Sequence, residues 1–283
     1  MSGLEEPVRK RQSRRGRSGR KTAAENTPTI SAPYITRNIP YYEVLDEEGL
    51  ELIESNAETI LSEIGIEFRD DSEALQIWKD AGADVKGERV RFPRGMCRSI
   101  IQASAPREYT QHSRNPARNI RIGGKNTVFA PAYGSPFVYD RDKGRRYATI
   151  EDFQNFVKLA YSSPGLHLSG GTICEPVDLP VNKRHFDMLY SHIKYSDKCF
   201  MGSVTTPERA EDTVAMSKIM MGENYIDTET GKPKTITTSL INANSPLTFD
   251  STMLGAAKIY ARNNQACTAP CQVAIPIVQF FRR

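Results

Sequence analysis

The sequence predicts an α/β protein that contains an incomplete TIM-like (β/α) barrel, preceded by a small α+β N-terminal extension. From residue 108 onward, β-branched apolar runs alternate with segments of helical periodicity, which is typical of parallel βα units. Each predicted strand ends in small or polar residues. In α/β barrels, the binding and catalytic groups lie at this carboxyl end of the strands. The sequence lacks the glycine-rich phosphate turn of open nucleotide-binding sheets. These strand ends lie at residues 133–134, 170–172, 202–203 and 242–244.

Three regions are expected from the composition. Residues 1–25 carry eight Lys or Arg against three Glu, whereas the remaining 258 residues hold 30 basic and 31 acidic groups. A tail of Arg, Ser and Gly cannot bury enough surface to offset its ordering entropy, so we expect residues 1–28 to be a disordered basic tail. Residues 29–107 are predicted to form the N-terminal α+β extension. Residues 108–283 are predicted to form the first half of a (β/α)8-type barrel.

The extension is predicted to contain three helices and two strands. Apolar residues at helical spacing, with acidic residues in the first turn, predict a helix over 46–64 that Gly65 ends. A strand is predicted at 66–68, a helix at 72–81 and a second strand at 89–92. Pro93 then begins a helix that extends to residue 105.

The barrel region begins with short β segments and continues as a βα alternation. Residues 109–112, 119–122 and 126–134 are extended in pattern, and the turn 141–144 predicts a β-hairpin. The helices expected after it are 150–161, 182–195, 207–221 and 250–263, and the strands between them are 166–172, 198–205 and 234–241.

Composition argues against several classes of protein. No apolar run approaches the ~20 residues that span a membrane, and no apolar segment follows the basic start as in a secretory signal. The five cysteines are odd in number and scattered, which fits reduced thiols in the cytoplasm better than a disulfide framework. Cys267 and Cys271 have no second ligand pair nearby, so no metal site is predicted.

The most informative segment is 235–247, a β-branched strand that ends in amide and hydroxyl groups. Asn242, Asn244 and Ser245 stand at its carboxyl end, Pro246 stops further pairing, and a helix follows. Binding groups of α/β barrels lie at this end of the strands, so we expect these three residues in a site. The alternative is an ordinary strand-to-helix turn, which also favours Asn, Ser and Pro.

With these segments in place, the chain resembles the trimethylamine–corrinoid methyltransferase family and its relatives that demethylate other quaternary or tertiary amines. The resemblance covers roughly residues 33–267 and is most specific at 241–250, 253–256 and 260–266. Supporting stretches are 64–66, 130–134, 170–172 and 175–176. It implies a (β/α)8 barrel that passes a methyl group from trimethylamine or a related amine to a corrinoid protein.

The chain also departs from the family pattern. Family members are much longer, and some carry pyrrolysine on a later barrel strand that has no counterpart here. The last sixteen or so residues do not resemble family sequence. We therefore expect a C-terminally truncated member, whose full-length form is expected to be a homo-oligomer.

Amine demethylation requires a pocket for a methylated ammonium group, and four residues at the earlier strand ends are candidates for it. Aromatic faces attract such cations, so Tyr133 is a candidate wall, with packing at the barrel rim as its alternative. Gly171 and Thr172 are expected to line the same pocket. Glu175 follows them and is a candidate anionic partner, unless it is a solvated loop carboxylate.

No catalytic residue is assigned from the sequence. His185 and His192 share a face of one predicted helix and are expected to be surface or packing residues. The sequence has no D-x-H-x-x-G cobalamin signature, so the corrinoid is expected to arrive on a partner protein rather than to bind this chain directly.

Two other functions stay open. One is an inactive barrel fragment that acts at most as a ligand-binding or interaction protein, since an open parallel sheet leaves unpaired edges. The other is nucleic-acid binding through the basic tail, which is disfavoured because the rest of the chain has no basic excess.

Overall fold

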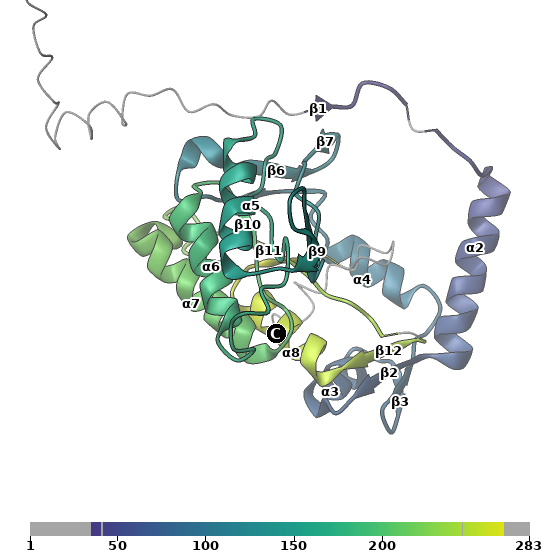
Figure 1. Ribbon diagram of the computed structural model, residues 1–283. Helices are drawn as coiled ribbons and strands as arrows, with labels where there is room; N and C mark the ends of the chain where they lie inside the picture. Colours follow the sequence, from purple (N-terminus) through teal and green to yellow (C-terminus); the bar gives the residue numbers. More distant parts are fainter. Residues whose placement is uncertain (1–34, 41, 245, 269–283) are drawn as a thin grey trace, which may run out of the picture. The chain divides into compact units, whose positions relative to one another are not determined.

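The computed structural model describes residues 35–40, 42–244 and 246–268, which form a mixed α/β fold (Figure 1). The predicted basic tail at 1–28 and residues 269–283 lie outside the described residues. The described residues belong to one compact unit that starts at residue 31.

The N-terminal elements form a helix followed by a small sheet with two further helices. α2 (Glu47–Thr59) continues as a π-helical turn (Ile60–Ile64) and ends at Gly65, whose φ of 75° favours glycine. A β-carbon at Gly65 would lie 2.3 Å from the carbonyl oxygen of Val90, so glycine also permits a close backbone approach. The other elements of this region are β1 (Ile35–Thr36), β2 (Ile66–Arg69), α3 (Ser72–Asp80), β3 (Asp84–Lys86), β4 (Arg89–Arg91) and α4 (Met96–Ser104).

One strand of that sheet comes from the far end of the chain. The sheet order is β12-β2-β4-β3, and β12 (Thr248–Asp250) pairs in parallel with β2. β12 was not predicted from the sequence, where a helix was expected directly after the loop. Phe249 of β12 stacks on Phe68 of β2, with ring centroids 5.7 Å apart. The N-terminal elements therefore share a hydrophobic core with the βα region.

Five segments of the βα region pair in parallel and in chain order. β10 (Phe200–Met201), β11 (Thr237–Leu240) and β13 (Ala266–Thr268) form the central sheet. Single parallel bridges extend it, from Leu168 to Cys199 and from Ser135 to Cys174. The predicted strands at 126–134 and 166–172 are thus present largely as extended segments with isolated bridges. The described part of the chain forms an open ladder and no closed barrel.

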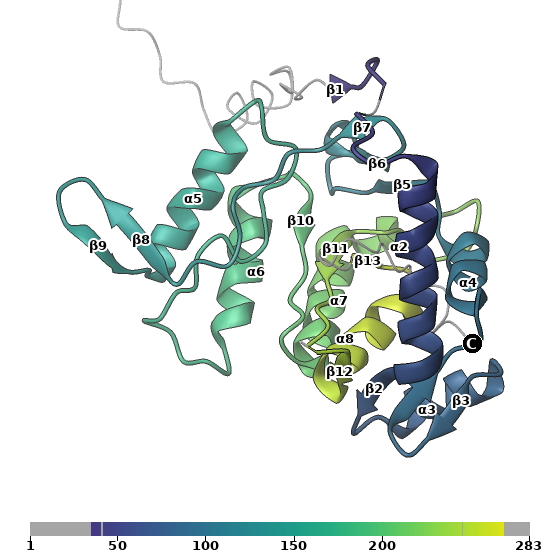
Figure 2. The ribbon, with the colours of Figure 1, turned by 90° about the vertical axis from the view of Figure 1, so that its right-hand side faces the viewer.

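Four helices follow the ladder segments and lie side by side in chain order (Figures 1 and 2). Phe200 and Ile236 pack against residues of these helices, including Leu189 and Met221. α7 and α8 bury small and apolar side chains, among them Ala210, Val214, Leu254, Ala257 and Tyr260. The helices are α5 (Ile150–Ser162), α6 (Arg184–Tyr195), α7 (Pro207–Met221) and α8 (Ser251–Arg262), which confirms the four predicted helices to within two residues at each end.

A β-hairpin packs against the other face of the ladder. It joins β5 (Glu108–Gln111) to β6 (Ile120–Gly123), and Ile120 of β6 packs with Leu168 and Cys199. The fully buried Gln111 amide nitrogen donates to the carbonyl oxygens of Phe200 at 2.8 Å and Ile236 at 2.9 Å. The hairpin is thereby hydrogen-bonded to two neighbouring strands.

The remaining elements are short. β7 (Asn126–Thr127) pairs with β1, and the predicted hairpin at 141–144 is confirmed as β8 (Phe137–Asp140) and β9 (Gly144–Tyr147), which lies near α5 in Figure 2. Two 3₁₀ turns occur at Pro116–Arg118 and Gly222–Tyr225.

A buried ion pair joins α8 to the N-terminal region. The ammonium group of Lys258 lies 2.7 Å from Asp71 Oδ1, and the two side chains are only 10% and 6% exposed. Asp71 also caps α3 by accepting from the amide of Ala74. Lys258 contacts Glu73 as well, at 2.8 Å. One helix is therefore connected electrostatically to a region almost 190 residues earlier in the chain.

We predict that Lys258→Met lowers the free energy of unfolding by about 3–5 kcal/mol, because it leaves the buried Asp71 carboxylate without its cation. Urea unfolding measures the change. Lys218→Met on α7 is the matched control and should change stability by less than about 1 kcal/mol, because Lys218 is exposed. Adding Asp71→Asn to Lys258→Met should recover part of the loss, since Asn still caps a helix. A Lys258→Met variant as stable as the parent would contradict this account.

Candidate functional site

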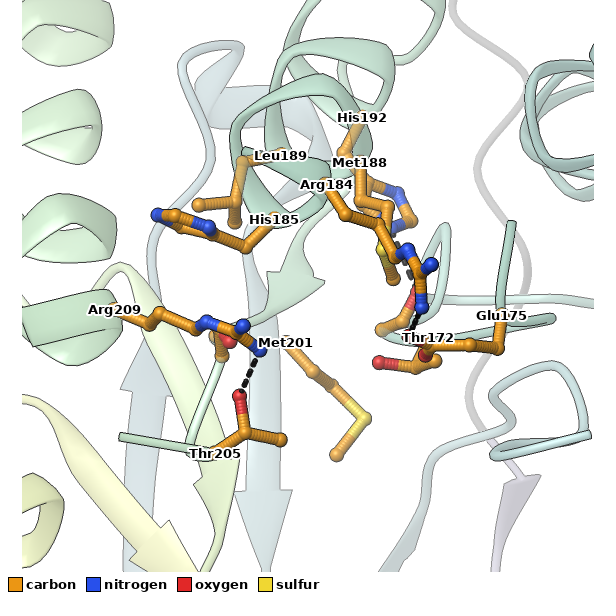
Figure 3. Close-up of a pocket in the computed structure, with 13 residues that line it drawn as sticks. Thr172, Glu175, Arg184, His185, Met188, Leu189, His192, Met201, Thr205 and Arg209 are labelled. Carbon is orange, nitrogen blue, oxygen red and sulfur yellow. Dashed lines mark hydrogen bonds and ion pairs between the residues drawn. The ribbon is translucent and has the colours of Figure 1, made fainter. Parts of the chain in front are cut away.

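A hollow lies at the carboxyl ends of two neighbouring ladder segments, 168–172 and β10. Its volume is about 470 Å³, including the space at its open mouth. Figure 3 shows side chains of α6 extending toward these strand ends. The hollow lies where α/β proteins bind ligands, outside the carboxyl ends of parallel strands. The lining residues are Gly171, Thr172, Glu175, Arg184, His185, Met188, Leu189, His192, Met201, Gly202, Ser203, Thr205 and Arg209.

Gly171 is the point of closest packing at this strand end. A β-carbon there would lie 2.7 Å from Cε2 of Tyr133 and 2.9 Å from Cβ of Met201. The missing side chain thus makes room for the Tyr133 ring, which stays 42% exposed. Backbone bonds hold the two segments together, since the amide of Gly134 donates to the carbonyl of Thr172 at 2.7 Å. The structure therefore brings Tyr133, Gly171 and Thr172 together.

His192 of α6 fixes the same strand end from the helical side. Its Nε2 donates to the carbonyl oxygen of Gly171 at 3.0 Å, and its Nδ1 lies 2.9 Å from Ser169 Oγ, which acts as the donor to the neutral ring. The ring lies parallel to Phe200, with centroids 5.9 Å apart. Burial lowers the pKa of His192 to about 4, so the imidazole is neutral at pH 7. His192 is a packing residue, as expected, and it also positions the strand end.

The carboxylate of Glu175 is partly exposed and is also paired with an arginine. Its Oε1 accepts a hydrogen bond of 2.5 Å from Arg184 Nη1 of α6, and its side chain is 39% exposed. Arg184 also donates to the carbonyl of Leu179, which fixes the connection between strand and helix. A role of Glu175 as anionic partner for an ammonium group therefore competes with this ion pair.

Arg209 and His185 are the other basic side chains of the hollow. Arg209 Nη1 donates to Thr205 Oγ1 at 2.6 Å, and Nη2 donates to the carbonyl of Val181 at 2.8 Å. His185 Nε2 lies 2.7 Å from Asp212 Oδ2 of α7. Neither Arg184 nor Arg209 was predicted from the sequence as a site residue. A signal was available, because both lie in the first turn of the helix that follows a predicted strand end.

Asn242 and Asn244 lie on the connection between β11 and α8 and do not line the hollow. Asn244 exchanges backbone hydrogen bonds with Thr248, and its Nδ2 donates to Asp250 Oδ2 at 2.6 Å. Asp250 caps α8 through its other oxygen, so Asn244 supports a turn. Asn242 is exposed and lies just after the end of β11. Ser245 lies outside the described residues, and the site role of all three stays a prediction.

The described cysteines show no sign of acting as nucleophiles. Cys97, Cys174, Cys199 and Cys267 are free thiols. Burial raises the pKa of Cys97 to about 11 and those of the other three to about 12, so all are protonated at neutral pH.

Within the described ranges, no group of three or more His, Cys, Asp or Glu is arranged to hold a metal ion. No helix among these residues is long and apolar enough to cross a membrane.

The fold and the hollow define a βα-repeat protein with a partly polar hollow at its strand ends. A family model described as trimethylamine methyltransferase (MTTB) matches residues 10–274. The chain belongs to this family, which confirms the resemblance seen in its sequence.

Two curated relatives refine the comparison. The chain is 47% identical over 228 residues to a glycine betaine methyltransferase of Desulfitobacterium hafniense (strain Y51), covering 81% of this chain and 46% of the relative. It is 27% identical over 174 residues to a proline betaine:corrinoid methyltransferase of Eubacterium limosum, covering 60% of this chain and 35% of the relative. The matched region thus spans less than half the length of either relative.

We predict that Gly171→Ala destabilises the chain by about 1–3 kcal/mol, because the added methyl overlaps Tyr133 and Met201. Thermal unfolding measures the loss. Gly165→Ala is the matched control and should be nearly neutral, since the nearest contact of its β-carbon is Ser163 Oγ at 4.0 Å. Adding Tyr133→Ala should relieve part of the strain in Gly171→Ala. Equal effects of the two glycine variants would contradict the packing described here.

The low pKa of His192 predicts a pH-dependent stability. Between pH 6.5 and about 4 the unfolded chain binds a proton at this residue and the folded chain does not, so stability is lost as the pH falls through this window. The loss amounts to about 3 kcal/mol. His192→Gln should remove this part of the pH dependence in urea unfolding at pH 7 and pH 4. Burial also lowers the pKa of His112, so His112→Gln is the comparison and should remove a smaller part of the pH dependence. An unchanged pH dependence in His192→Gln would refute the assignment.

Proposed function

We propose that the chain takes part in methyl transfer from a betaine-type quaternary amine to a corrinoid protein. The observation that carries this proposal is membership of the trimethylamine methyltransferase family over residues 10–274. The choice of a betaine over trimethylamine rests on the two relatives, both of which are named for betaines.

The strand-end geometry supports binding of a methylated ammonium group. Tyr133 is not itself a lining residue of the hollow, but its half-exposed ring lies against Gly171, which lines it. An aromatic face attracts such a cation by ~0.5–2 kcal/mol. Met188 and Met201 add apolar, polarisable surface for the methyl groups. These residues would hold and orient the donor while it reacts.

The transfer proposed is a displacement at the methyl carbon. The C–N bond breaks, its electron pair stays on nitrogen, and the acceptor supplies both electrons of the new bond to carbon. Glycine betaine would thereby give dimethylglycine and a methylated acceptor. The acceptor we propose is the cobalt(I) corrinoid of a partner protein, in line with the word corrinoid in one relative's name.

Finer features of the protein are part of the same proposal. We propose that the five-segment parallel ladder belongs to the (β/α)8 barrel that the family resemblance implies, and that the active form is a homo-oligomer in the cytoplasm. The described free thiols are compatible with a reducing compartment. The alternative is a ligand-binding or interaction protein without transfer activity. It is kept because the match covers less than half of each relative.

The test is methyl transfer by the 283-residue chain to a purified cobalt(I) corrinoid protein, with glycine betaine, proline betaine or trimethylamine as donor. Formation of the demethylated amine is followed by mass spectrometry. We expect turnover with glycine betaine and a slower reaction with trimethylamine. Tyr133→Ala should raise the donor's apparent Kd about 2- to 30-fold, whereas Tyr133→Phe should not.

Tyr139→Ala is the matched control, because Tyr139 lies on β8 and is 82% exposed. Turnover with trimethylamine alone would overturn the choice of a betaine. Donor binding without demethylation of any amine would favour the alternative function.

A further inference from the structure

We propose that the hollow recognises a carboxylate, with Arg209 as its main contact, and so selects zwitterionic methylated amines over simple ones. The identity of the ligand rests on the proposed function, whereas the anion site rests on the geometry of the hollow. Figure 3 shows Arg184 of α6 and Arg209 of α7 both extending toward the strand ends.

The charges that line the hollow do not cancel. Arg184 is neutralised by Glu175. No carboxylate lies within ion-pair distance of Arg209 among the described residues, and its two hydrogen bonds go to a hydroxyl and a backbone carbonyl. His185 is paired with Asp212. Arg209 therefore forms no direct ion pair among the described residues, although the neighbouring Glu208 interacts with it electrostatically. A bound carboxylate would supply the missing direct partner.

A second arginine that lines the hollow, Arg184, lacks one hydrogen-bond acceptor. Arg184 Nε is buried and has no hydrogen-bond acceptor, although its two terminal nitrogens are bonded to Glu175 and Leu179. Buried donors without acceptors cost free energy, so such groups are expected to find a partner. A ligand carboxylate could accept from Arg209, and the unsatisfied Nε of Arg184 adds a second donor group near the same strand ends.

The rest of the lining fits the other end of a zwitterion. Met188, Leu189 and Met201 are apolar, and Thr172 adds a hydroxyl group. Trimethylamine is a cation at neutral pH and has no carboxylate, so the unpaired charge of Arg209 would disfavour it. Glycine betaine carries the compensating anion.

The experiment is titration calorimetry on the 283-residue chain without a corrinoid protein. The probes are glycine betaine, choline, which replaces the carboxylate with a hydroxymethyl group, and acetate, which has no ammonium group. We expect glycine betaine to bind at least tenfold more tightly than choline, and acetate to compete with it. Arg209→Gln should weaken glycine betaine about tenfold or more, because a charge-assisted hydrogen bond is lost, and should not weaken choline, because a repulsive charge is removed.

Two variants separate a binding effect from a folding defect. Arg209→Lys keeps the charge and should retain part of the preference. Arg98→Gln, on α4 and outside the hollow, should leave all three affinities unchanged. Thermal unfolding of each variant checks that it is folded.

Equal affinity for glycine betaine and choline, no binding of any probe, or an Arg209→Gln variant with unchanged preference would overturn the carboxylate site. The two proposals fail separately. Carboxylate-dependent binding together with absent methyl transfer would reject the proposed function and keep the site. Methyl transfer with no dependence on the carboxylate would reject the carboxylate site and keep the proposed function.

Discussion

The placement of every candidate site group depends on one backbone constraint, the parallel pairing of five chain segments in sequence order. Parallel strands in chain order put all their carboxyl ends at one edge, because each crossover helix returns the chain to the opposite edge. The amide of Met201 donates to Gly170 and that of Ser169 to Cys199, which aligns two of these ends side by side. The hollow forms where they meet.

The crossover helices also determine the chemistry of the hollow. His192 of α6 is bonded to the carbonyl of Gly171 while its ring stays neutral. The first turns of α6 and α7 supply Arg184 and Arg209, each also bonded to the chain between strand and helix. A helix that covers the ladder is thus also the source of the cationic groups at its edge. The side chains that pack α6 against the ladder and the cationic groups of the hollow thus lie on the same pair of helices.

Local patterns predicted much of this structure. Helical periodicity located the four helices of the βα region, and the turn 141–144 was enough to predict the β8–β9 hairpin. β12 could not be predicted, because three residues pair with β2 only through tertiary packing of Phe249 on Phe68. The same limit applies to the site. Strand-end residues such as Gly171 and Thr172 follow from the βα rule, whereas the unpaired charge of Arg209 depends on where neighbouring carboxylates lie in space.

The most direct test of the account is a crystal structure of the 283-residue chain with glycine betaine bound. The account predicts the ligand in the hollow, with its carboxylate within hydrogen-bond distance of Arg209 and its methylated nitrogen near Gly171 and Met201. A ligand bound on the opposite face of the ladder beside Leu240, or at Asn242, with no contact to Arg209, would contradict it.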